Sequence, residues 1–122
     1  MFMNILVFDI ETVPDIESGR RLYDLEGLTD REMAEVMFSR RRQETDGSSD
    51  FLRLHLHRVV AISVVLATRD RLSVWSLGDA GAAEAEIVQR FYEGIERYSP
   101  RLVSWNGRCF DLPVLHYRSL VH

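Results

Sequence analysis

The chain has one cysteine, no lysine and no long apolar run, and the first and last of these shortages exclude whole classes of protein. A single cysteine, Cys109, cannot form an intrachain disulfide, so a reducing cytoplasm is the simplest expected setting. No apolar run approaches the roughly 20 residues that a transmembrane helix needs. Acids follow the first apolar segment at once, which argues against a signal peptide. We therefore expect a cytoplasmic protein without a membrane span.

The absence of lysine leaves arginine as the only strongly basic residue. All 15 basic residues are arginine, which is typical of a GC-rich genome, and the formal net charge is -4. This charge argues against a non-specific nucleic-acid coat protein, which would be basic. It is compatible with an enzyme that binds nucleic acid locally, through metal ions and a few arginines.

Four apolar or β-branched runs predict the strands of one sheet: 4–10, 58–68, 72–77 and 101–105. The first run is apolar on both faces, which predicts a central strand that is covered on both sides and interrupted at Pro14. The short turn 69–71 joins the second and third runs into an antiparallel hairpin.

Helical patterns fill the intervals between these strands. Thr29 and Glu32 have the spacing of a capping box, and apolar residues at helical spacing follow them, so residues 16–50 are expected to form a helical and flexible excursion. Residues 82–98 predict a helix, and a last helix is expected from about Asp111. The order of elements indicates a single α/β domain over residues 1–122, with a mixed sheet.

The stretch "FDIET" places two carboxylates at the end of the first strand. Asp9 and Glu11 should point to the same face, because side chains alternate along a strand. Two carboxylates about 4 Å apart repel by about 4 kcal/mol at an effective dielectric constant of 20. A raised pKa, an arginine between them or a divalent cation would relieve this repulsion. Taken alone, the pair is also typical of a solvated strand end.

A second strand end, "VSWNGRCFDLPVL", carries Asp111. Its carboxylate could cap the last helix, with Pro113 tolerated in the first turn. If the two strand ends lie side by side in one sheet, Asp111 would instead approach Asp9 and Glu11. Oxygen ligands at that density favour Mg²⁺ or Mn²⁺ over zinc.

Together, "FDIET" and "WNGRCFDLPVL" resemble the first two motifs of the DEDD (DnaQ-like) 3′–5′ exonucleases. Within that superfamily the chain is most similar to the predicted exonucleases related to the proofreading domain of family-B DNA polymerases. The stretch "HRVVAIS" (57–63) also resembles their second strand. The resemblance implies a ribonuclease H-like sheet that is incomplete at its C-terminal end.

The resemblance also implies the residues of a site. Asp9, Glu11 and Asp111 would be the catalytic metal ligands, holding two Mg²⁺ or Mn²⁺ ions about 4 Å apart for phosphodiester hydrolysis. The 3′ end of a single-stranded DNA or RNA would be the substrate. The substrate-binding residues would be Thr12, Asn106, Arg108 and Phe110.

The family has a third motif, His-x₄-Asp or Tyr-x₃-Asp, which supplies a fourth carboxylate and the general base. No Asp or Glu follows Asp111 in this sequence. We therefore expect the sequence to be the N-terminal part of a longer exonuclease, with little or no activity by itself, since losing a general base typically costs 10²- to 10⁴-fold.

The alternative is a non-catalytic module that keeps the exonuclease fold and binds nucleic acid or a protein. An unfinished sheet edge would also favour self-association, so a homodimer is a further expectation.

Overall fold

The computed structural model describes residues 3–79, 81–104 and 107–122, with only the backbone described at 107 and 108. The chain divides into two compact units. The first comprises Met1–Thr12 and Val59–His122, and the second comprises Val13–Arg58. The expected excursion, 16–50, lies within the second unit, and the assignment of both units to one exonuclease-like domain stays a prediction.

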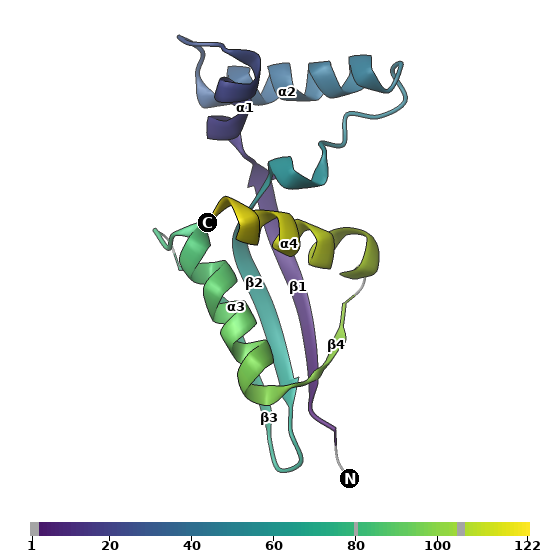
Figure 1. Ribbon diagram of the computed structural model, residues 1–122, viewed down its shortest axis with the longest axis vertical. Helices are drawn as coiled ribbons and strands as arrows, with labels where there is room; N and C mark the ends of the chain where they lie inside the picture. The colour runs from purple at the N-terminus through teal and green to yellow at the C-terminus, as the bar shows by residue number, and fades with distance from the viewer. Residues whose placement is uncertain (1–2, 80, 105–106) are drawn as a thin grey trace. The chain divides into compact units, whose positions relative to one another are not determined.

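A mixed sheet forms the first unit, with the strand order β3-β2-β1-β4 (Figure 1). The strands are β1 (Ile5–Pro14), β2 (His57–Ala67), β3 (Leu72–Leu77) and β4 (Arg101–Val103). β2 and β3 form the predicted antiparallel hairpin, while β4 pairs in parallel with β1. This order confirms the α/β, ribonuclease H-like fold that the sequence predicted.

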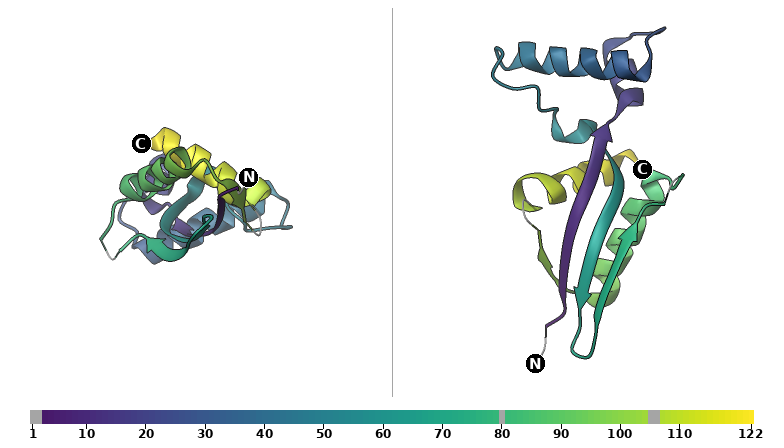
Figure 2. Two further views of the ribbon diagram at one scale, coloured as in Figure 1. Left: turned by 90° about the horizontal axis from the view of Figure 1, so that it is seen from below. Right: turned by 180° about the vertical axis from the view of Figure 1, so that it is seen from behind.

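Both helices of the first unit, α3 (Glu84–Tyr98) and α4 (Leu112–Val121), pack on one face of the sheet (Figures 1 and 2). Phe8 of β1 meets Phe91 of α3 with 4.9 Å between their ring centroids. Val114 and Leu115 of α4 are fully buried. Apolar burial between this face and the two helices is the main source of stability for the unit.

The other face of the sheet is open among the residues that the structure describes. Val7 keeps 43% of its surface exposed and Val74 keeps 73%. The prediction that β1 is covered on both sides is therefore wrong: its burial alternates from residue to residue along Leu6–Glu11. An apolar strand can have one face exposed, because hydrophobic content alone does not say what packs against it.

The second unit is built on two helices, α1 (Ile16–Tyr23) and α2 (Asp30–Glu44), followed by the short 3₁₀ turn η1 (Leu54–Leu56). The capping box is confirmed: Thr29 Oγ1 accepts from the Glu32 N–H, and Glu32 Oε1 accepts from the Thr29 N–H. The buried core of this unit consists of Met33, Met37, Leu52 and Leu56.

α1 was not predicted from the sequence, and Gly19 explains both why it was missed and how it packs. Glycine inside a short segment argues against a helix. A Cβ at this position would lie 2.5 Å from the sulfur of Met37, so the missing side chain lets α1 approach α2 closely. None of the helices in the described part of the chain has the length and apolarity that crossing a bilayer requires.

Candidate metal and nuclease site

β1 holds Asp9 and Glu11 on the open face of the sheet. Phe8 and Ile10 are buried beneath the helices, while Asp9 and Glu11 are exposed. The prediction that the two carboxylates share one face is thus confirmed. Their positions follow directly from the two-residue period of a strand whose other face packs against α3 and α4.

Asp111 is brought to the same strand from about a hundred residues away. It ends a π-helical turn, Gly107–Asp111, that leads into α4, and only 4% of its surface is exposed. Its Oδ2 accepts a hydrogen bond from the Ile10 N–H at 3.3 Å and another from Ser104 Oγ at 3.1 Å. The backbone N–H between Asp9 and Glu11 is therefore the point where the second motif meets the first.

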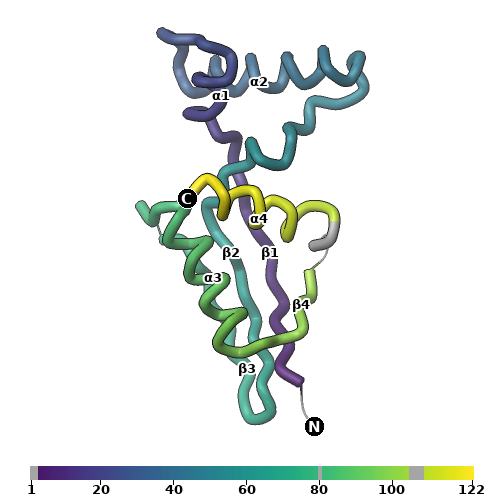
Figure 3. Tube along the Cα trace, in the orientation of Figure 1, coloured from purple at the N-terminus to yellow at the C-terminus, as the bar shows by residue number. Residues whose placement is uncertain are grey.

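The divergence of β4 from β1 explains this contact. The two strands pair only from Ile5–Arg101 to Val7–Val103, after which β4 turns away (Figure 3). The Ile10 N–H lies beyond the paired residues and needs an acceptor, because a buried N–H without one is costly. The Asp111 carboxylate supplies that acceptor.

The helix-capping alternative for Asp111 is wrong. Asp111 occupies the N-cap position of α4, but its side chain makes no capping hydrogen bond. Instead the carboxylate accepts hydrogen bonds from the Ile10 N–H of β1 and from the Ser104 hydroxyl. Asp111 therefore joins α4 to the strand that carries the other two acids.

The donor chemistry of the three acids suits a hard divalent cation, since carboxylate oxygens are the ligands that Mg²⁺ and Mn²⁺ prefer. Within the ranges that the structure describes, however, no group of three or more His, Cys, Asp and Glu residues could hold a metal ion. Asp9 and Glu11 face the open side, whereas Asp111 is buried and hydrogen-bonded to the backbone of β1. The structure thus brings Asp111 to the strand without forming a three-carboxylate cage.

The four predicted substrate-binding residues are only partly described. Thr12 and Phe110 are half-buried, Thr12 on β1 and Phe110 in the turn before Asp111. Asn106 and the side chain of Arg108 lie outside the described residues. Their assignment to substrate binding stays a prediction, as does that of Thr12 and Phe110.

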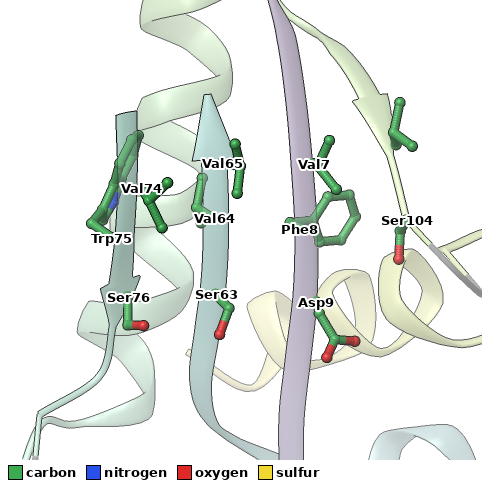
Figure 4. A pocket seen from close by; sticks show the side chains of 11 residues that line it. Val7, Phe8, Asp9, Ser63, Val64, Val65, Val74, Trp75, Ser76 and Ser104 are labelled. Atoms are coloured by element: carbon green, nitrogen blue, oxygen red, sulfur yellow. The ribbon is translucent and has the colours of Figure 1, made fainter. Parts of the chain in front are cut away.

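A hollow of about 590 Å³ lies beside Asp9 on the open face (Figure 4). Figure 4 shows two rows of side chains across the sheet, one of valines and one of hydroxyls that ends at Asp9. Val7, Val65 and Val74 belong to the first row, and Ser63 and Ser76 to the second. Asp9 therefore lies at the polar edge of an apolar surface.

Sequence reasoning missed two polar features of the first unit. One is Ser104, which donates to Asp111; its only signal was its place at a strand end. The other is a buried acid, Glu84, in the first turn of α3. An acid there is an ordinary partner of the helix dipole, so nothing in the sequence distinguished it from a solvated one.

Glu84 is surrounded by donors. Its carboxylate accepts two hydrogen bonds from Arg118, at 2.9 and 2.6 Å, and one from the Val59 N–H at 2.6 Å. His122 Nε2 lies 2.8 Å from Oε1. Burial by itself would raise the pKa of Glu84, but the hydrogen bonds from Arg118, His122 and Val59 outweigh it and place the pKa below the ordinary value. The carboxylate joins α3, α4 and β2.

Comparison with known proteins connects this geometry to a family. Residues 49–122 match the family described as "Predicted 3'-5' exonuclease related to the exonuclease domain of PolB". The matched range contains Asp111 and begins beyond Asp9 and Glu11. No curated protein and no solved structure matches the chain. Because the matched residues make up more than half of the chain, it belongs to the family of predicted 3′–5′ exonucleases related to the exonuclease domain of PolB.

Proposed function

We propose that the chain carries part of a metal-dependent site that hydrolyses phosphodiester bonds at the 3′ end of single-stranded DNA or RNA. The observation that carries this proposal is the hydrogen bond from the Ile10 N–H to Asp111. It connects the second acidic motif to the first in a chain whose family consists of predicted exonucleases.

In this proposal Asp9 and Glu11 provide two carboxylate ligands from the open face of the sheet. Asp111 provides the third from the turn before α4. These three carboxylates would hold Mg²⁺ or Mn²⁺, which when bound would supply positive charge at the phosphate and activate water for hydrolysis. Ser104 and the Ile10 N–H hold Oδ2 of Asp111 in one orientation. The hollow beside Asp9 gives a terminal nucleotide access to the carboxylates.

Thr12, Asn106, Arg108 and Phe110 are assigned to binding the terminal nucleotide. No acid follows Asp111 in the sequence, so the proposed site has no general base of its own. We expect the chain alone to trim 3′ ends weakly or not at all, and binding of the metal is therefore the more direct test.

The first experiment is a titration with Mn²⁺ followed by thermal unfolding. A ligand that binds only the folded state stabilises it by about 2.7 kcal/mol at 100 times its dissociation constant. The wild-type chain should gain stability with Mn²⁺, and Asp9→Ala should lose that gain. Asp70→Ala is the matched control, because Asp70 is also an exposed aspartate of the first unit but lies in the hairpin turn.

A second variant separates the charge of Asp111 from its structural hydrogen bonds. Asp111→Asn keeps an oxygen that can accept from the Ile10 N–H and from Ser104, but it removes the negative charge. We expect the variant to fold and to respond less to Mn²⁺. If Mn²⁺ stabilises none of these proteins while a labelled single-stranded oligonucleotide still binds, the chain is a non-catalytic binding module instead.

A further inference from the structure

The open face of the sheet is an exposed apolar surface with charges of opposite sign at its two ends. Its centre is a row of valines in which Val7 pairs with Val103 and Val65 pairs with Val74. Val74 is 73% exposed, and Leu72 beside it is 70% exposed. Surfaces of this kind commonly mark an interface.

The acidic end of this face carries Asp9 and Glu11. The opposite end carries Arg101, which lies across from Ile5 on β4 and shares the face of Val103. Arg69 and Arg71 are exposed in the hairpin turn that precedes Leu72. Within the described ranges, none of these five charged side chains forms an ion pair.

The valine row lies midway between the two charged ends. Arg101 is level with Ile5, two residues before Val7 on β1, and Asp9 is two residues after it. At about 3.3 Å per residue, each charge is therefore about 7 Å from the row, in opposite directions along the strand. A half-turn about an axis that crosses the strands at Val7 would exchange the levels of these two charges along the strands, with Arg101 on β4 and Asp9 on the neighbouring β1.

We propose that a second copy of this chain covers the open face, with its strands antiparallel to those of the first. A two-fold interface must be complementary to itself, and this face meets that condition in one orientation only. In the antiparallel orientation the valine rows meet at the axis, and Arg101 of each copy faces Asp9 of the other. In the parallel orientation acids would face acids, at a cost in repulsion. The pairing does not depend on nuclease activity, but it uses the face that carries Asp9, so a second copy bound there excludes a terminal nucleotide from the hollow.

The oligomeric state of the full chain tests this pairing. Sedimentation analysis over a range of concentrations should show a species of twice the 14.2 kDa chain mass. Val74→Asp should weaken the dimer by at least about tenfold, because it places a charge at the centre of the interface. Leu120→Asp is the matched control, since Leu120 is also 73% exposed but lies on α4. A monomer at every concentration, or equal losses in both variants, would overturn the proposal.

Charge exchange tests the orientation. Arg101→Glu and Asp9→Arg should each weaken the dimer, and the double variant should recover much of the loss, because the two charges then attract again. Arg90→Glu, an exposed change on α3, should leave the dimer unaffected. Circular dichroism establishes that each variant is folded. A dimer that is strengthened by Arg101→Glu, or a double variant that is weaker than both single ones, would contradict the antiparallel arrangement.

Discussion

Two acidic positions of the first unit, Glu84 and the pair Asp9–Glu11, have opposite surroundings. Glu84 is buried and accepts hydrogen bonds from a guanidinium group and a backbone N–H. Asp9 and Glu11 are exposed on the other face of the same sheet, close to each other on one strand. The first arrangement satisfies a charge within the fold, and the second leaves two charges to be satisfied by something else. A structural acid and a candidate ligand are thus distinguished by their partners rather than by residue type.

The largest expected effect is at Glu84. Glu84→Gln would leave the guanidinium of Arg118, which is 3% exposed, buried without its counter-charge. Breaking a buried pair in this way typically costs about 3–5 kcal/mol. Urea denaturation, followed through tryptophan fluorescence, should show this loss in the free energy of unfolding.

Glu86→Gln is the control for this substitution, because Glu86 is an exposed acid in the first turn of the same helix. Glu86→Gln should change the free energy of unfolding by no more than about 0.5 kcal/mol. If both variants lost the same small amount, the buried pair would not stabilise the unit, and the comparison between the two acidic positions would fail.

The next largest expected effect is the dependence on pH of the stability that Glu84 contributes. Because the folded pKa of Glu84 lies below its ordinary value of 4.5, the unfolded state binds a proton more readily than the folded state. The stability that Glu84 contributes is therefore complete above that value and is lost as the pH falls through the folded pKa. One such group changes the free energy of unfolding by at most about 1.4 kcal/mol per pH unit.

Urea denaturation of the wild type and of Glu84→Gln at several pH values measures this contribution, since the other acids are common to both proteins. The difference in stability between them should shrink as the pH is lowered below about 4.5. A difference that stays constant down to the acid transition would show that Glu84 is not ionised preferentially in the folded state.

Local patterns in the sequence predicted much of this molecule. The capping box at Thr29, the hairpin around its Arg69–Arg71 turn and the shared face of Asp9 and Glu11 all depend on residues close together in the chain. For such features the period of the backbone and the chemistry of a turn are sufficient.

Features that depend on distant residues could not be predicted in this way. Whether Asp111 caps its own helix or bonds to β1 is decided by where β4 diverges, which the sequence of the turn does not contain. Glu84 and Arg118 are separated by 34 positions, and either one alone resembles a solvated charge. The open face of β1 was missed because an apolar residue such as Val7 does not specify what covers it.

The smallest expected effect is a gain in the free energy of unfolding at Asp9, opposite in sign to the loss expected at Glu84. At concentrations low enough to keep the chain monomeric, Asp9→Asn should stabilise the metal-free protein slightly, by a few tenths of a kcal/mol, because it relieves the repulsion of Glu11 on the same strand face. The gain should shrink at high salt, since both groups are exposed to screening. Thermal unfolding at low and high NaCl measures it. Asp70→Asn, between Arg69 and Arg71, should be neutral or slightly destabilising instead, because that acid has positive neighbours. If Asp9→Asn destabilised the chain at low salt, Asp9 would have a stabilising partner within the fold. Asp9 would then be a structural acid like Glu84 and not a candidate metal ligand.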